Sequence, residues 1–169
     1  MPMEIERKFL VVSDAWRGRG MPAGRRFCQG YLAGGDGVSV RVRRAGDEAF
    51  ITIKGDAIGP ARPEYEYPIP VAEAEELLSR LCRRPLIEKT RHEVLHDGHV
   101  WEIDVFGGAN AGLVLAEVEL SDPHERFALP PWVGAEVTFD PRYRNSALAA
   151  APVGVPSVDR AAPTPSAGA

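Results

Sequence analysis

The fold of this chain is decided by one stretch near its start, MEIERKFLVV at Met3–Val12. The charged residues Glu4, Glu6 and Lys8 occupy every second position of this stretch, and apolar side chains fill most positions between them. Successive side chains of a β-strand point to opposite faces. The stretch therefore predicts a strand with one charged face and one apolar face.

The same alternation recurs in seven further runs, which are separated by turn residues such as Asp97-Gly98. These runs are Arg25–Leu32, Val38–Arg44, Ala49–Lys54, Arg62–Ile69, Leu86–Leu95, Val100–Phe106 and Leu113–Leu120. Short connections favour antiparallel neighbours, and about eight strands close a barrel that can hold one small ligand. We predict a mostly β (α+β) fold, namely an eight-stranded antiparallel closed barrel with a few peripheral helices.

Two helices are predicted outside the strand runs. At Val71–Cys82, apolar residues such as Ala74 and Leu78 recur at helical spacing, with acidic residues near the start and arginines near the end. This charge order complements the helix dipole, and the helix would cover part of the apolar outside of the barrel. A second, shorter helix is expected after Asp140-Pro141, because Asp caps helices and Pro starts them.

Most of the predicted strands carry charged side chains two residues apart on one face. Together these faces hold Glu4, Glu6, Glu64, Glu66, Glu102, Asp104, Glu117, Glu119, Lys8, Arg41, Arg43, Lys54, Lys89 and Arg91. In a single strand this pattern is typical of a half-buried sheet whose charged face meets water. Because it repeats in seven strands with few neutral polar residues, it favours a charged lumen inside the barrel.

A lumen that contains both signs of charge suits a polyanion bound together with a metal ion. Arg and Lys bind phosphate groups, and carboxylates bind hard divalent cations such as Mg²⁺ or Mn²⁺. Two carboxylates in a Glu-x-Glu pair lie about 7 Å apart on one strand face. Such pairs occur in the first predicted strand and in the last, which a closed barrel would bring together. The sequence thus indicates metal-dependent phosphoryl chemistry.

The overall composition excludes several other classes of protein. The 169 residues include 20 Lys and Arg against 24 Asp and Glu, a net charge of −4, which argues against a protein whose main task is to bind nucleic acid. No apolar run approaches the roughly 20 residues of a membrane helix, and no signal peptide is visible, so we expect a cytoplasmic protein with no membrane partner. Cys28 and Cys82 lack the spacing of a zinc site.

The length and the C-terminal composition predict one domain at residues 1–149. Residues 150–169 consist mainly of Ala, Pro, Gly and Ser. Such a segment buries too little apolar area to offset its ordering entropy, so we expect a disordered Ala/Pro-rich tail.

The motifs of the chain, taken in order, resemble those of the CYTH superfamily, the triphosphate tunnel metalloenzymes, and in particular its short prokaryotic inorganic triphosphatases. The first is the E-x-E-x-K signature at Glu4-Ile5-Glu6-Arg7-Lys8. The others are Gln29-Gly30-Tyr31-Leu32, Arg41-x-Arg43, Thr52-x-Lys54-Gly55, Arg62-x-Glu64-Tyr65-Glu66, Glu88-Lys89-Thr90-Arg91, Glu102-x-Asp104-Val105-Phe106, Ala116-Glu117-Val118-Glu119 and Asp140-Pro141-Arg142-Tyr143-x-Asn145.

The resemblance implies a tunnel that hydrolyses inorganic tripolyphosphate with two Mg²⁺ or Mn²⁺ ions, and it assigns roles to individual residues. The metal ligands would be Glu4, Glu6, Asp104, Glu117 and Glu119. The substrate-binding residues would be Arg41, Arg43, Lys54, Arg91, Glu64 and Glu66. The catalytic residues would be Lys8, Tyr31 and Lys89, with Lys8 and Tyr31 acting on the leaving group or the attacking water. The sequence leaves open whether Tyr31 is instead a core aromatic residue.

The sequence is also compatible with several alternative functions. The same tunnel would also suit hydrolysis of thiamine triphosphate or cyclisation of ATP to cyclic AMP, as in a class IV-type adenylate cyclase. A non-catalytic polyphosphate- or nucleotide-binding module is a further alternative, although such a module gains little from carboxylates near its ligand. The expected partner is a small triphosphate, and a homodimer is left open.

Overall fold

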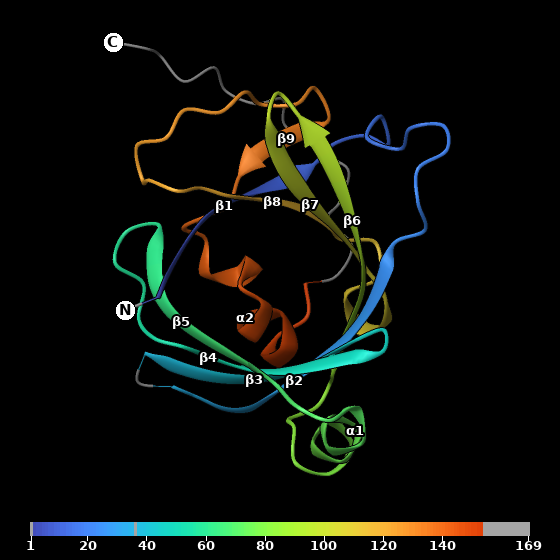
Figure 1. Cartoon of the computed structure of the whole chain (residues 1–169), viewed down its shortest axis with the longest axis vertical. Helices are drawn as coiled ribbons and strands as arrows, with labels where there is room; N and C mark the ends of the chain where they lie inside the picture. Colours follow the sequence, from blue (N-terminus) through green and yellow to red (C-terminus); the bar gives the residue numbers. More distant parts are fainter. Residues whose placement is uncertain (1, 36, 154–169) are drawn as a thin grey trace.

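The computed structural model describes residues 2–35 and 37–153. Within these residues the chain forms nine β-strands and two α-helices (Figure 1). The strands are β1 (Met3–Val11), β2 (Arg25–Gly35), β3 (Val38–Ala45), β4 (Glu48–Lys54), β5 (Ala61–Pro68), β6 (Ile87–His96), β7 (His99–Phe106), β8 (Val114–Glu119) and β9 (Val133–Glu136). The eight predicted runs correspond to β1 to β8. The short β9 was not predicted, because four residues are too few to show a clear alternation.

β1 to β8 close into an antiparallel barrel, as predicted. The strand order is β5-β4-β3-β2-β6-β7-β8-β1, and a further pairing of β5 with β1 closes the ring. β1 achieves this by pairing with β8 along one edge and with β5 along the other. β9 also pairs with β1, at Phe9 and Val11, nearer the C-terminal end of β1 than the residues that pair with β5. The register places Glu6 opposite Glu119 and Lys8 opposite Glu117, so the two Glu-x-Glu strands are direct neighbours.

The helix α1 (Val71–Arg80) packs on the outside of the barrel, below the β3 and β4 ribbons in Figure 1. Its buried Ala74 and Leu78 share a core cluster with Val42 and Ala49, which confirms the predicted cover for this part of the wall. The segment after α1 then lies directly against β2. A Cβ atom at Gly30 would lie 2.7 Å from the Cβ atom of Cys82, so glycine allows this close approach.

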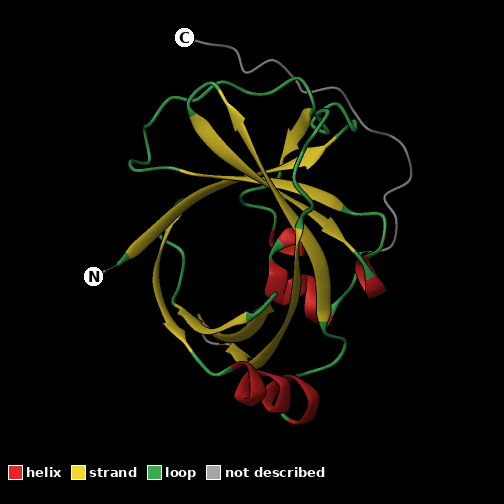
Figure 2. Ribbon diagram, turned by 45° about the vertical axis from the view of Figure 1, so that its right-hand side comes forward, coloured by secondary structure: helices red, strands yellow, loops and turns green. Residues whose placement is uncertain are grey.

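The C-terminal part of the described chain lies at one end of the barrel. Asp140 caps the 3₁₀-helix η2 (Pro141–Tyr143) by accepting a hydrogen bond from the backbone N–H of Arg142 at 3.0 Å, as the sequence predicts. The helix α2 (Asn145–Ala150) follows and lies within the outline of the barrel in Figures 1 and 2. Its Leu148 is fully buried, in a cluster with Ile87 and Leu115.

In the described part of the chain, no helix has the length and apolar character needed to span a membrane. The tail predicted at 150–169 lies outside the described residues from residue 154 onward.

The long segment between β8 and β9 covers the apolar outer faces of β1, β7 and β8. Trp101 of β7 is fully buried there, with its ring 5.8 Å from that of Phe127 and 5.7 Å from that of Trp132. Ile103 belongs to the same cluster. With their outer faces covered in this way, the strands turn their charged faces inward.

We expect Ile103→Val to lower the free energy of unfolding by about 0.5–1.5 kcal/mol, because it removes one methylene group from a fully buried site. Denaturant unfolding measures this change. Val100→Ala is the matched control, since Val100 lies on the same strand and is half exposed. Equal losses in the two variants would contradict the placement of Ile103 in a close-packed core.

Candidate active site

The barrel encloses a cavity of about 220 Å³ that is lined almost entirely by charged side chains. The lining residues are Glu4, Glu6, Arg41, Arg43, Lys54, Glu64, Glu66, Arg91, Glu102, Glu117, Glu119 and Asn145. The inward orientation of the charged strand faces is thereby confirmed. Ten of the fourteen predicted site residues line this cavity, and the remaining four, Lys8, Tyr31, Lys89 and Asp104, lie beside or behind it.

Glu117 lies at the junction of two basic side chains. Its carboxylate is 3.3 Å from Lys8 Nζ and 3.5 Å from Arg91 Nη2. Burial by itself would raise the pKa of Glu117, but the charges of Lys8 and Arg91 outweigh burial and hold that pKa well below its usual range. The charges of Lys8 and Arg91 therefore favour the ionised form of Glu117. Its buried Oε1 accepts no hydrogen bond within the described residues.

Asp104 lies behind the wall of the cavity and pairs with two basic side chains, Lys89 and Arg91. It accepts hydrogen bonds from Lys89 Nζ at 2.6 Å and from Arg91 Nε and Nη2, each at 2.7 Å. Burial would raise the pKa of Asp104, but Lys89 and Arg91 lower it overall. Burial, together with the charges of Arg91 and Arg43, lowers the pKa of Lys89 to about 7. Asp104 thus fixes the position of Arg91, whose guanidinium extends onward into the lumen.

On the opposite wall, Arg41 and Arg43 of β3 are held by neutral side chains and, for Arg41, also by Glu66 of β5, whose Oε2 lies 3.5 Å from Arg41 Nη2. Arg41 Nη2 donates to Thr52 Oγ1 at 3.1 Å, and that hydroxyl donates to Glu66 Oε2 at 2.8 Å. Arg43 Nε donates to Gln29 Oε1 at 2.9 Å. Arg41 Nε is buried and has no hydrogen-bond acceptor among the described residues, so part of this guanidinium is free to bind a ligand.

The acidic residues of β1 and β5 share one lysine. Lys54 Nζ lies 2.5 Å from Glu4 Oε2 and 2.6 Å from Glu64 Oε2. Burial and the neighbouring charge of Glu6 raise the pKa of Glu4 to about 7. In the described part of the chain, no three Asp, Glu, His or Cys side chains converge closely enough to hold a metal ion as they stand. The lumen instead pairs its carboxylates with basic side chains.

The start of α2 reaches into the lumen through Asn145. Its Oδ1 accepts hydrogen bonds from Lys89 Nζ at 3.2 Å and from Gln29 Nε2 at 3.3 Å. Lys8 Nζ also donates to the carbonyl oxygen of Tyr143, just before α2, at 3.2 Å. Asn145 was not among the predicted site residues. The signal that could have found it is its place at the end of the Asp140-Pro141-Arg142-Tyr143-x-Asn145 motif.

Lys8 and Tyr31 meet at a narrow cavity of about 40 Å³ beside the lumen. Tyr31 is buried and also belongs to the apolar cluster around Ile87 and Leu115. Both readings of this residue therefore have support, since the same ring packs in the core and borders the cavity that Lys8 lines.

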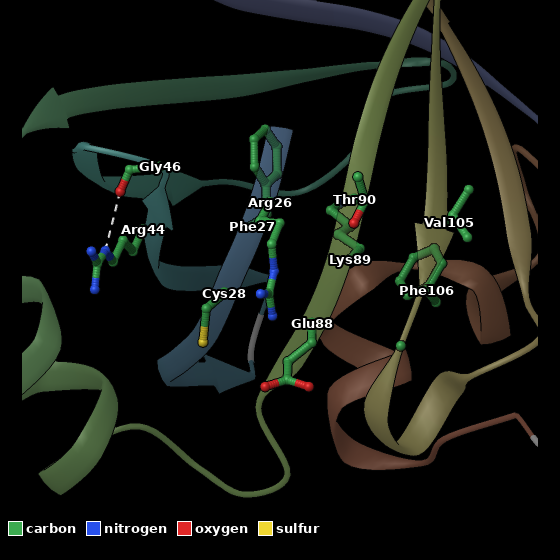
Figure 3. Close-up of a pocket in the computed structure, with 11 residues that line it drawn as sticks. Arg26, Phe27, Cys28, Arg44, Gly46, Glu88, Lys89, Thr90, Val105 and Phe106 are labelled. Atoms are coloured by element: carbon green, nitrogen blue, oxygen red, sulfur yellow. Dashed lines mark hydrogen bonds between the residues drawn. The ribbon is translucent and has the colours of Figure 1, made fainter. Parts of the chain in front are cut away.

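A separate cavity of about 520 Å³ lies on the outer side of β2 and β6 (Figure 3). In this view, Cys28 and Glu88 point to one side of their strands and Phe27 points to the other. The cavity contains the exposed Glu88 together with Arg44, which is paired with Glu75 of α1. Acidic and basic surface side chains therefore line this cavity outside the barrel, and it does not belong to the lumen.

Comparison with known proteins identifies the family. The family model of the CYTH domain matches residues 2–152. The chain belongs to the CYTH domain family. The resemblance seen in the motifs is thereby confirmed over nearly the whole described chain.

Two inorganic triphosphatases are among the proteins similar to this chain. One, from Acetivibrio thermocellus, is 48% identical over 148 residues, which cover 88% of this chain and 94% of the relative. The other, from Nitrosomonas europaea, is 42% identical over 154 residues, which cover 86% of this chain and 96% of the relative. The crystal structure of the inorganic triphosphatase NE1496 superposes with a TM-score of 0.66 at 40% identity, covering 89% of this chain and 100% of that one.

Proposed function

We propose that this CYTH barrel hydrolyses inorganic tripolyphosphate to pyrophosphate and orthophosphate with the help of divalent cations. The observation that carries the proposal is the charged lumen of about 220 Å³, in which the carboxylates of β1 and β8 face arginines and a lysine from β3, β4 and β6. Relatives that are 48% and 42% identical over most of the chain are inorganic triphosphatases, which supports this substrate.

The residues that would hold Mg²⁺ or Mn²⁺ are Glu4, Glu6, Glu117 and Glu119, with Asp104 close behind them. Two observations fit a cation at this place. Glu117 Oε1 is buried and faces Lys8 Nζ at 3.3 Å without forming a hydrogen bond, and burial of Glu4 beside Glu6 raises the pKa of Glu4 to about 7. A bound divalent cation would neutralise phosphate charge and polarise a water molecule for attack on phosphorus.

The substrate phosphates would lie against Arg41, Arg43, Lys54 and Arg91. The guanidinium group forms two parallel hydrogen bonds to a phosphate, whereas lysine contributes a point charge. Arg91 is held in place by Asp104, and Arg41 by Thr52. Because these side chains are already oriented, they need little reorganisation when the substrate binds. Such positioning, together with electrostatic stabilisation, is the main source of catalysis in phosphoryl transfer.

Lys8 would act on the leaving pyrophosphate. In the reaction the oxygen of a water molecule bonds to a terminal phosphorus, the bond from that phosphorus to the bridging oxygen breaks, the bridging oxygen leaves with the pyrophosphate, and the proton lost by the water passes to solvent. Burial would lower the pKa of Lys8, but Glu117 and Glu6 raise it overall, so Lys8 stays cationic at neutral pH. A cation suits stabilisation of the leaving group better than abstraction of a proton. Tyr31 and Lys89 complete the proposed catalytic set.

The lumen favours a bare phosphate chain over a nucleotide or thiamine triphosphate. The residues that line it in the described structure include no aromatic side chain on which a base or thiazole ring would stack. The carboxylates of the lumen also distinguish this proposal from a binding module that captures polyphosphate without hydrolysing it.

A phosphate-release assay over a substrate panel tests the proposed function. We expect rapid release from tripolyphosphate with Mg²⁺ or Mn²⁺, at least about tenfold lower activity with ATP or thiamine triphosphate, and loss of activity in EDTA that added metal restores. Preference for thiamine triphosphate, or formation of cyclic AMP from ATP, would contradict the substrate. Tight binding of tripolyphosphate without turnover would instead identify a binding module.

A further inference from the structure

A second basic cavity lies outside the lumen, at the end of the barrel where α2 sits. It has a volume of about 560 Å³ and is lined by four arginines, namely Arg62, Arg83, Arg84 and Arg144. Asp56 is the one carboxylate among its lining residues in the described structure. We call this cavity the α2-side mouth. In contrast to the lumen, its charge is almost entirely of one sign.

The narrow cavity of about 40 Å³ lies between the α2-side mouth and the lumen and shares lining residues with both. On the outer side, Tyr31, Arg62 and Arg144 line both the mouth and the narrow cavity. On the inner side, Arg41 and Lys54 line both the narrow cavity and the lumen. A row of basic side chains, with Glu6 beside it, therefore extends from the lumen toward the four arginines.

The arginines of the mouth lack the ion pairs that most basic residues of the lumen have. Across residues 2–35 and 37–153, ion pairs engage seven arginines, and none of the four at the mouth is among them. Arg84 Nη2 donates only to the carbonyl oxygen of Ser79, at 3.0 Å. Arg62 Nε is buried and has no acceptor in this part of the chain. Several guanidinium donors are therefore available to a ligand.

The backbone holds the two consecutive arginines at this place. The N–H of Arg83 donates to the carbonyl oxygen of Tyr31 at 3.0 Å, and Cys82 packs against Gly30 on the same strand. The segment after α1 is thus fixed to β2, the strand whose Tyr31 borders the narrow cavity. The position of Arg83 and Arg84 at the mouth follows from the fold.

We propose that the α2-side mouth is a second anion site, which binds a phosphate oxyanion without a metal ion. Four unpaired guanidinium groups around one cavity repel one another, and an anion that accepts paired hydrogen bonds relieves this repulsion. Carboxylates for a cation are almost absent here. The link to the lumen rests on the proposed function, and it gives the anion two sources. One is orthophosphate released in the lumen, and the other is the end of a polyphosphate chain longer than tripolyphosphate.

Binding of orthophosphate in EDTA tests the site itself, because it needs neither metal nor turnover. We expect orthophosphate to shift the backbone amide NMR signals of Gly37, Arg83 and Arg84, and the double variant Arg83→Ala/Arg84→Ala to weaken this binding about tenfold. The matched control is Arg19→Ala/Arg126→Ala, which removes two exposed arginines that have no ion pair in the described structure. Equal affinity in the two double variants would overturn the site. This binding measurement does not depend on hydrolysis, so it tests the anion site even if the protein proves inactive on tripolyphosphate.

Kinetics distinguish the two sources of the anion. If the mouth receives released orthophosphate, the Arg83/Arg84 variant should need about tenfold more orthophosphate for inhibition, with the KM for tripolyphosphate unchanged. If it receives the end of a longer chain, the KM for tetrapolyphosphate should rise about tenfold, again with that for tripolyphosphate unchanged. Identical inhibition and identical KM values in the variant and its control would overturn the link between mouth and lumen.

Discussion

Glu117→Gln is expected to reduce metal-dependent hydrolysis of tripolyphosphate by about a thousandfold or more, which is the scale of losing a main electrostatic element of a site. Glu117 is buried at the centre of the lumen wall and stays charged because Lys8 and Arg91 lower its pKa. Glutamine keeps the shape of the side chain but loses the charge that would bind a cation. Phosphate release at saturating Mg²⁺ or Mn²⁺, together with calorimetric titration of Mn²⁺, measures both effects.

In Glu117→Gln, a loss of activity through unfolding must be distinguished from a loss through weaker metal binding. Removal of one member of a buried ion pair lowers the free energy of unfolding by about 3–5 kcal/mol. Glu119→Gln provides the second variant. Glu119 also lines the lumen, but it is exposed and has no ion pair in the described part of the chain, so this change should spare stability and still weaken Mn²⁺ binding about tenfold or more. Glu88→Gln, at an exposed acid of the outer cavity, is the control. Full activity and unchanged Mn²⁺ affinity in both lumen variants would refute the metal assignment.

Arg41→Ala is expected to raise the KM for tripolyphosphate about ten- to a hundredfold, because hydrogen bonds to charged groups contribute about 1.5–3 kcal/mol each. Arg41 is buried, is oriented by Thr52, and has a free Nε. It therefore carries donors that the folded chain leaves unused. Steady-state kinetics over a range of tripolyphosphate concentrations measures the change.

Arg44→Ala is the matched control for this prediction. Arg44 lies on the same strand, but it points to the outer side, where it pairs with Glu75 of α1. Its loss should leave the KM within about twofold of the original value, since an exposed ion pair of this kind contributes about 1 kcal/mol or less, and only to stability. If Arg41→Ala behaved like Arg44→Ala, the phosphate clamp would have to be assigned to other side chains.

The sequence predicted much of the lumen because one local rule applies to every strand. Alternation places Arg41 and Arg43 on one face and Val42 on the other, whatever the partner strand is. Repetition of the rule in eight strands was enough to predict a closed barrel with charges inside. It also placed Glu117 and Glu119 on the same face, and closure of the barrel then set them beside Glu6 and Lys8 of β1.

Neutral residues of the site were harder to predict from the sequence. Gln29 and Asn145 carry no charge, so the pattern of charged faces gives them no weight. The structure nevertheless gives both of them contacts with basic residues of the site, since Gln29 accepts a hydrogen bond from Arg43, which lines the lumen, and Asn145 accepts one from Lys89, which lies behind it. The position of Arg83 at the α2-side mouth was also not predicted, because in the sequence Arg83 is one of several arginines at the end of a helix.

The sequence by itself determined which side chains face the lumen and which family the chain belongs to, since strand alternation and motif order are properties of neighbouring residues. Only the tertiary structure decided how these charges pair, as when Asp104 holds both Lys89 and Arg91. It also decided that α2 lies at one end of the barrel and that Arg83 lies at that mouth. The physical reason is that register, closure and packing join residues far apart in the chain, and local periodicity contains no information about those distances.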